Sequence, residues 1–190
     1  AIGRYSSVIS HWPDSDYATR SQFKKARCLE KLEHYKQACE EYVRLTYLYP
    51  DSSLVADATA RLGNYFYRNE KFKTAGRIFY KFQQNNPEHR LAPKGLFLAG
   101  QCHMRMKDYK EAIRILKLLL ETYKEEHKIR SEAMYWLADS YSKSLDYVNA
   151  YRVFKKLTWD YPTTKWAKIA RGRLTDAVYT GIEEAEVSHR

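Results

Sequence analysis

YPDSSLVADATARLGNYFYRNEKFKTAGRIFYKFQQNNP, residues 49–87, predicts two amphipathic helices between one proline turn and the next. The rest of the chain repeats this stretch every 37 or 38 residues. Three series of residues share the period: prolines, alanines, and small residues twelve positions before the alanines. They are Pro13, Pro50, Pro87 and Pro162; Ala1, Ala38, Ala75, Ala112 and Ala150; and Ala26, Gly63, Gly100 and Ala138. A fixed period of this length is typical of a solenoid of helix pairs.

The apolar residues of each repeat recur with the period of an α-helix. In the second helix of the best repeat, Phe72, Ala75, Phe79 and Phe82 lie at offsets of three and four, which puts them on one face. The pattern predicts helices over 15–33, 35–49, 52–69, 71–86, 89–106, 108–125, 129–144, 146–161 and 163–180. We therefore expect an all-α fold, an α-solenoid of antiparallel helix pairs forming a right-handed superhelix.

Glycine in the middle of a helix costs about 1 kcal/mol relative to alanine, so Gly63 and Gly100 need a physical reason. We expect close helix packing, with each small residue facing an alanine of the next helix. Side-chain oxygens of the Asp14-Ser15, Asp51-Ser52-Ser53 and Thr163-Thr164 segments are expected to cap the following helices.

The repeat predicts one solenoid domain over residues 1–180. Its parts are a half repeat (1–13), four repeats (14–50, 51–87, 88–124 and 125–162) and a terminal helix (163–180) that Gly181 ends. An acidic tail, 181–190, follows. Because Ala1 already belongs to the alanine series, we expect the chain to begin inside a repeat of something longer. Residues 124–128 lack the proline and are densely charged, which predicts a loose, solvated turn.

The net charge of +10 permits an acidic protein, a nucleic acid or an anionic membrane as partner. Three cysteines do not form a disulfide framework, and Cys28 and Cys102 share one repeat position that favours burial. No apolar run reaches the ~18 residues that span a bilayer. The six dispersed histidines and the lack of a Gly-rich loop predict neither metal, cofactor nor enzyme chemistry.

The repeat unit resembles the tetratricopeptide repeat. It has a small residue, an alanine twelve positions later, an aromatic residue or leucine four positions after the alanine, and a proline eight positions after that. In residues 51–87 the matching positions are Gly63, Ala75, Phe79 and Pro87. Turns such as Tyr49-Pro50-Asp51-Ser52-Ser53 are similar to those of bacterial envelope proteins. These are the BamD-like lipoprotein of outer-membrane assembly and the Tol–Pal-associated cell-division coordinator. The resemblance implies a protein–protein interaction scaffold in the bacterial periplasm or at the outer membrane.

Such arrays bind partners on the concave face that the first helix of each pair lines. Three rows of residues are expected on that face, three before, one after and five after the small residue. The first row holds Phe23, Phe97 and Tyr135 (with Ala60), the second Arg27, Asn64, Gln101 and Asp139, and the third Lys31, Arg68, Arg105 and Lys143. The third row is cationic throughout and predicts an acidic or carboxylate-bearing partner.

Other readings of these residues stay open. Lysine and arginine near the end of a helix also complement the helix dipole, and the aromatic row could be buried by the adjoining repeat. The lysines of a chaperone-type carboxylate clamp are absent from the first row, which argues against that role. A cytoplasmic adaptor is the alternative setting. Nucleic-acid binding is the less favoured alternative function, because the second row lacks a convincing base-reading pattern.

Overall fold

The computed structural model describes the backbone of residues 1–188 and the side chains of residues 1–182. The described chain forms eleven α-helices and no strand, which confirms the all-α prediction. Its contacts fall into two compact units, Ala1–Gly95 and Leu96–Arg190, which are described separately. One continuous array over residues 1–180 stays a prediction.

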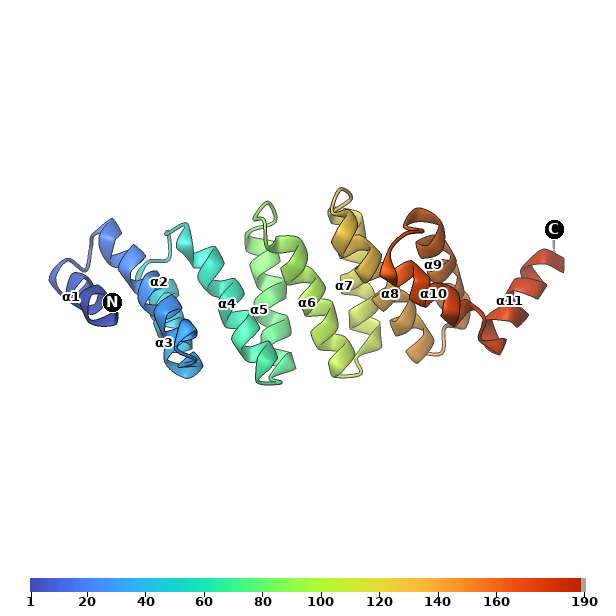
Figure 1. Cartoon of the computed structure of the whole chain (residues 1–190), viewed down its shortest axis with the longest axis horizontal. Coiled ribbons are helices and arrows are strands. Elements are labelled where there is room, and N and C mark those ends of the chain that lie inside the picture. Colours follow the sequence, from blue (N-terminus) through green and yellow to red (C-terminus); the bar gives the residue numbers. More distant parts are fainter. Residues whose placement is uncertain (189–190) are drawn as a thin grey trace. The chain divides into compact units, whose positions relative to one another are not determined.

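The first unit is a stack of helices that alternate in direction (Figure 1). Its helices are α1 (Ile2–His11), α2 (Asp16–Lys31), α3 (Tyr35–Leu48), α4 (Leu54–Arg68) and α5 (Phe72–Asn85), and α6 (Ala92–Arg105) begins in it. From α1 to α5, each helix packs against the next. A cluster of small and apolar side chains from α2, α3 and α4 forms the core. The cluster is Ala26, Leu29, Ala38, Cys39, Tyr42, Leu45, Ala58 and Leu62.

The second unit contains the rest of α6 and five further helices. They are α7 (Tyr109–Thr122), α8 (His127–Lys143), α9 (Tyr147–Asp160), α10 (Lys165–Leu174) and α11 (Ala177–Ser188). Helix α8 packs against α7, α9 and α10, and α11 packs against α9. The pairs α2–α3, α4–α5 and α8–α9 are the helix pairs that the sequence period predicts.

The predicted helix starts are confirmed by capping bonds. The hydroxyl of Ser15 accepts a hydrogen bond from the amide of Ala18 at 3.1 Å, and that of Thr164 accepts one from Ala167 at 3.2 Å. Before α4, Ser52 rather than Ser53 is the acceptor, from the amide of Leu54. These bonds satisfy amides that the first turn leaves free.

The first helix of each complete pair ends in the left-handed conformation without a glycine. The residues concerned are Glu33, Glu70, Lys107 and Leu145, with φ between 57° and 66°. After α4, the amide of Glu70 donates to Tyr67 and that of Lys71 to Phe66, the two bonds of a Schellman motif. The chain therefore reverses direction between the two helices of a repeat through backbone hydrogen bonds. The residue with positive φ is not a glycine, so its Cβ atom is under steric strain.

Close helix packing at the glycines is confirmed, but the partners are not alanines. A methyl group on Gly63 would lie 2.5 Å from the ring of Phe79, and one on Gly100 would lie 3.0 Å from Leu116. Phe79 and Leu116 come four residues after the alanines of the series, and both are fully enclosed. The glycines therefore make room for large buried side chains of the partner helix.

The expected turn at residues 124–128 is confirmed as solvated, since all five residues are exposed, but the expectation that it is loose is wrong. Helix α8 already begins at His127, and its Arg130 reaches back to the end of α7. The guanidinium donates to the carbonyls of Leu120 and Tyr123 and, at 3.0 Å, to the hydroxyl of Tyr161. This arginine closes the turn that lacks a proline.

The expected single helix over residues 163–180 is also wrong. Helix α10 ends at Leu174, and α11 runs from Ala177 through Gly181, where the helix was expected to end. The carbonyl of Asp176 accepts from the amides of Tyr179 and Thr180 and starts the new helix. The break lets Tyr179 become buried, with its ring centroid 5.8 Å from that of Phe154.

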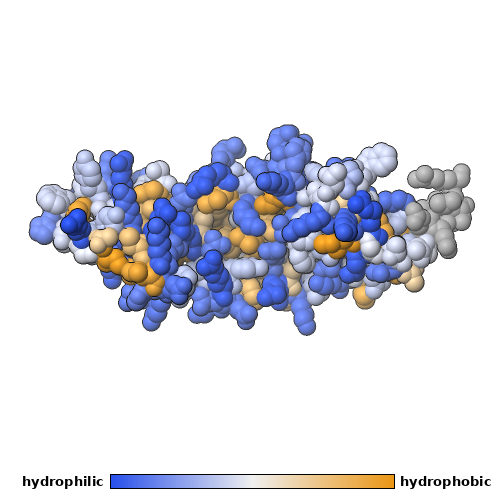
Figure 2. All heavy atoms as spheres, viewed as in Figure 1, coloured by the Kyte–Doolittle hydropathy of each residue, from blue (hydrophilic) through white to orange (hydrophobic). Residues whose placement is uncertain are grey.

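The predicted acidic tail is helical up to Ser188, and residues 189–190 lie outside the described residues. Within the described part of the chain, no helix is long and apolar enough to cross a membrane. Hydrophilic residues dominate the visible surface, and hydrophobic ones interrupt it in patches, one of them over α2 and α3 (Figure 2).

Candidate functional site

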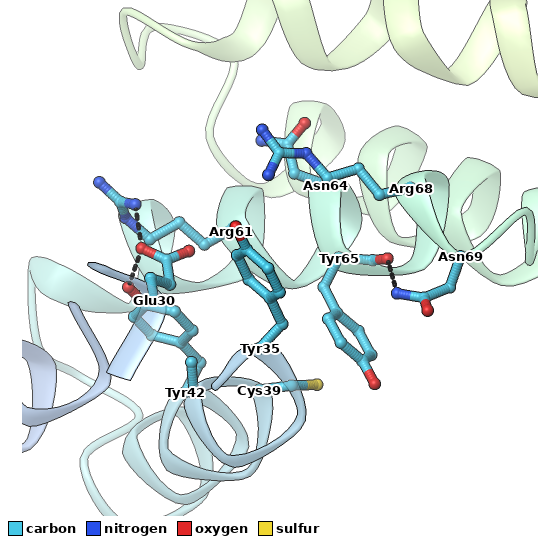
Figure 3. Close-up of a pocket in the computed structure, with 10 residues that line it drawn as sticks. Glu30, Tyr35, Cys39, Tyr42, Arg61, Asn64, Tyr65, Arg68 and Asn69 are labelled. Atoms are coloured by element: carbon cyan, nitrogen blue, oxygen red, sulfur yellow. Dashed lines mark hydrogen bonds and ion pairs between the residues drawn. The ribbon is translucent and has the colours of Figure 1, made fainter. Parts of the chain in front are cut away.

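A cavity of about 390 Å³ opens between α2, α3 and α4 in the first unit (Figure 3). Helix α2 contributes one carboxylate, and α3 contributes aromatic and small side chains. Helix α4 contributes two arginines, one amide and one tyrosine, and a second amide follows its end. The lining residues are Glu30; Tyr35, Ala38, Cys39 and Tyr42; and Arg61, Asn64, Tyr65, Arg68 and Asn69. The helical period places Arg61, Asn64, Tyr65 and Arg68 on one side of α4.

The single carboxylate of the cavity is already engaged. A guanidinium nitrogen of Arg61 lies 2.5 Å from the Glu30 carboxylate, and the Tyr42 hydroxyl donates to the same oxygen at 3.0 Å. The Arg61 guanidinium also lies over the rings of Phe23 and Tyr42, at 5.8 and 6.0 Å from their centroids. Burial, reinforced by the Glu30 charge, raises the pKa of Tyr42, so its hydroxyl stays protonated. This network is structural, and it neutralises Glu30.

Arg68 and Asn64 are the groups of the cavity that remain available. Both are exposed, lie one turn apart on α4 and line the cavity (Figure 3). None of the described residues gives either side chain a hydrogen bond or an ion pair. A guanidinium beside an amide offers several N–H donors, which suits a carboxylate.

The first predicted row is mostly packing. Phe97 is completely buried, so the expectation that it lies on the partner-binding face is wrong. Phe23 packs on Tyr42 with ring centroids 5.7 Å apart, and Tyr135 packs on Trp166 at 5.0 Å. Burial, followed by the nearby Asp139 charge, raises the pKa of Tyr135. Neighbouring helices cover these rings, which was the other reading that the sequence left open.

The second row divides between surface and interior. Arg27 and Asn64 are exposed and Gln101 is half-buried, whereas Asp139 is only 5% exposed. The buried Asp139 carboxylate lies 2.7 Å from the ammonium of Lys143, one turn along α8. This pair holds together two residues that were expected to contact a partner.

The third row is exposed at Lys31, Arg68, Arg105 and Lys143. Among these, Lys143 already has the Asp139 carboxylate as its counter-charge. Lys31 at the end of α2 has no ion pair with a described residue, like Arg68. Of all the predicted residues, the cavity brings together only Asn64 and Arg68, while Arg27 and Lys31 lie on α2 outside its lining.

Sequence reasoning missed the other residues of the cavity. Glu30 and Arg61 stand in different repeats, 31 positions apart, and no local pattern connects them. Tyr35 lies 37 positions before Phe72, at the repeat position predicted to face the neighbouring helix, yet it is 43% exposed at the cavity. The aromatic spacing marked Tyr35 as an interface residue without showing that one side of it stays open.

Comparison with known proteins agrees with this architecture. The model of the tetratricopeptide repeat matches residues 20–52, 94–125 and 132–164, just over half of the 190 residues. The chain belongs to the tetratricopeptide-repeat (TPR) family. Protein–protein interaction is the general function of TPR proteins. No curated protein matches this TPR chain in sequence.

Several solved structures share the TPR fold. MamA from Desulfovibrio magneticus RS-1, from residue 41 to its end, is 14% identical, with a TM-score of 0.65 over 86% of this chain and 85% of that chain. YrrB, described as a TPR protein with an unusual peptide-binding site, is 16% identical, with a TM-score of 0.64 over 94% and 88%. TPR-like repeats of a putative kinesin light chain from Podosopora anserina are 13% identical, with a TM-score of 0.64 over 82% and 81%. These likenesses show the fold alone, and the resemblance to BamD-like or Tol–Pal proteins stays a prediction.

Proposed function

We propose that this TPR protein is a non-catalytic scaffold that binds an acidic segment of a partner protein at the α2–α4 cavity. The observation that supports this most directly is the pair of available donors, Arg68 and Asn64, in a cavity whose own carboxylate is neutralised. A carboxylate entering beside Arg68 meets donors without displacing an internal partner. YrrB, a TPR protein of the same fold, is described as having a peptide-binding site, which supports a peptide as the ligand.

The charges around the cavity favour an anion. Arg27 and Lys31 add exposed cations to α2, the helix that also carries Glu30, and Arg61 balances the Glu30 charge. Tyr35 and Tyr65 supply hydroxyls and ring faces, which suit an extended segment that also carries apolar side chains. Because these cations are exposed, the attraction should weaken as salt rises.

The test is the affinity of the whole chain for a fluorescent polyglutamate peptide, with polyglutamine as the neutral probe. Losing a charge-assisted hydrogen bond at an exposed site costs about 1 kcal/mol, so Arg68→Ala should weaken polyglutamate binding about fivefold. Asn64→Ala should act in the same direction. The control is Arg77→Ala, which removes an exposed cation of α5 outside the cavity.

Equal losses in Arg68→Ala and Arg77→Ala would show that only net charge matters, which contradicts the proposed site. A gel-shift with single-stranded RNA at physiological salt addresses the alternative function. A shift that is stronger than peptide binding and survives Arg68→Ala would replace the scaffold proposal with nucleic-acid binding.

We also propose the bacterial cell envelope as the setting, with envelope biogenesis or cell-division partners. The support is the likeness of the Tyr49-Pro50-Asp51-Ser52-Ser53 turn to envelope TPR proteins. Immunoblotting of fractionated source cells tests this setting. Recovery only with the cytoplasmic fraction would favour the adaptor alternative.

A further inference from the structure

Helices α10 and α11 meet at a bend that the local sequence does not require (Figure 1). The bend consists of Thr175 and Asp176, and it contains neither proline nor glycine. Thr175 has φ −83° and ψ −6°, within the right-handed helical region. The amide of Asp176 donates to the carbonyl of Arg173 at 3.0 Å, a spacing of three residues where a continuous α-helix uses four. A small change of the backbone therefore joins α10 and α11 into one helix, as the apolar period of residues 163–180 predicts.

Helix α11 is held in the bent form by one side chain. Among residues 177–182, the part of α11 whose side chains the structure describes, only Tyr179 is buried. Tyr179 is 1% exposed, whereas the preceding Val178 is 40% exposed. A helix of twelve residues is marginally stable in water without tertiary contacts. Tyr179 is therefore the anchor of α11.

The anchor lies in a slot between α8 and α9, formed by Ser142, Tyr147 and Phe154, which we call the Tyr179 slot. The hydroxyl of Tyr179 is hydrogen-bonded to that of Ser142, which is itself buried. The rings of Phe154 and Tyr147 meet the Tyr179 ring edge-on, with centroids 5.8 and 6.3 Å from it. Two aromatic walls and one hydroxyl suit a tyrosine, whichever copy of the chain supplies it.

A second copy of this chain is the occupant that fits the Tyr179 slot best. In a continuous helix, Tyr179 lies about 7.5 Å beyond Leu174 along the axis of α10 and does not turn back onto α9. Straightening therefore empties the slot and presents the anchor to another molecule in one step. Exchange of α11 between two copies restores every contact of the slot, so the bent monomer and the exchanged dimer differ mainly at the hinge. An unrelated protein would have to compete with an anchor on the same chain.

We propose that this protein dimerises by exchanging α11 between two copies, with Thr175 and Asp176 as the hinge and Tyr179 of each copy in the Tyr179 slot of the other. In the dimer the amides of the hinge gain regular helical hydrogen bonds. The exchange uses the second unit alone, whereas the proposed peptide site lies in the first unit.

The test is light scattering after size-exclusion chromatography of the whole chain over a wide range of concentrations. The parent chain should show a monomer–dimer equilibrium. Thr175→Ala with Asp176→Ala should raise the association constant about tenfold or more, because alanine favours the continuous helix. Ala177→Pro should lower it about tenfold or more. Proline is accepted at the first position of α11 but clashes inside a continuous helix.

Tyrosine variants separate exchange of α11 from association through another surface. In the Thr175→Ala, Asp176→Ala background, Tyr179→Ala should lower the association constant at least about tenfold, because the exchanged helix loses its anchor. Tyr179→Phe keeps the ring and should retain most of the dimer. Tyr47→Ala is the matched control, since it removes a tyrosine that is 83% exposed on α3, and it should leave association unchanged.

Three results would overturn the proposal. One is a parent chain and an alanine hinge variant that both stay monomeric at every concentration. The others are a dimer that Ala177→Pro leaves unchanged and an effect of Tyr179→Ala no larger than that of Tyr47→Ala. Circular dichroism of each variant shows whether it is folded. The hinge variants keep the Tyr179 ring, so the test stands even if Tyr179→Ala unfolds the second unit.

Discussion

Gly63→Ala should destabilise the protein even though alanine favours a helix. The added methyl would lie 2.5 Å from one ring atom of Phe79 and 2.8 Å from two others, whereas carbon atoms pack at roughly 3.5–4 Å. Phe79 is 1% exposed, so its ring has no free space into which to move. Overpacking of this kind costs about 1–3 kcal/mol, and an overlap of this size belongs near the upper end. Subtracting about 1 kcal/mol gained from helix propensity leaves a net loss of about 2 kcal/mol.

Gly172→Ala is the matched control. Gly172 also lies inside a helix, α10, but a methyl group there would meet nothing within 4 Å. It should therefore stabilise the protein by up to about 1 kcal/mol through helix propensity alone. Urea denaturation followed by circular dichroism measures the free energy of unfolding of both variants and of the parent chain. The slope of that free energy against urea concentration shows whether the denatured state has changed.

A double variant tests the cause. Phe79→Leu should cost less in the Gly63→Ala variant than in the parent chain, with a coupling energy of at least about 1 kcal/mol, because the smaller side chain makes room for the methyl. Two results would refute the packing argument. One is a Gly63→Ala variant as stable as Gly172→Ala, and the other is an equal cost of Phe79→Leu in both backgrounds.

Three further predictions concern the repeat turns and the thiols. Glu70→Gly should raise the free energy of unfolding by about 0.5–1 kcal/mol, as measured by urea denaturation. A left-handed residue with a side chain costs about 1–2 kcal/mol, and the greater conformational entropy of glycine in the unfolded chain offsets part of the gain from removing it. Glu70→Ala keeps the Cβ atom and should show no such gain. Arg130→Met should destabilise the second unit by about 2 kcal/mol, since it leaves two backbone carbonyls without their charged hydrogen-bond donor. Amide hydrogen exchange at the end of α7 should accelerate. Unchanged exchange there would contradict the role of this arginine. Burial raises the pKa of the Cys102 thiol to about 12, so this thiol is protonated at pH 8 and should be alkylated far more slowly than that of the half-buried Cys28. In urea the two alkylation rates should become equal. Mass spectrometry of the two peptides measures the rates, and equal rates in the folded protein would contradict the prediction.

In the candidate site between α2, α3 and α4, the two arginines of α4 have different surroundings. Arg61 is held between Glu30 and two aromatic rings, so its positive charge is compensated by groups of the protein itself. Arg68, two turns further along α4, lines the same cavity and is not part of that network. The two arginines of one helix thus have different tasks, one structural and one available for a partner.

The amino-acid sequence by itself determined the local structure and the repeat. The apolar period, the turn prolines and the capping residues Ser15 and Thr164 act within a few positions of the chain, so the all-α helix pairs and most helix bounds could be predicted. The close approach at Gly63 was predictable for the same reason, since a glycine in a helix requires compensation from packing.

Only the tertiary structure decided which predicted residues reach the surface. Phe97 and Phe23 occupy equivalent positions, yet one is fully enclosed and the other is half-buried beside Arg61. The break between α10 and α11 likewise depends on the burial of Tyr179 against Phe154, which lies in another helix. Exposure at a given helical position depends on the side chains of neighbouring helices, and the period of the helix itself contains no information about them.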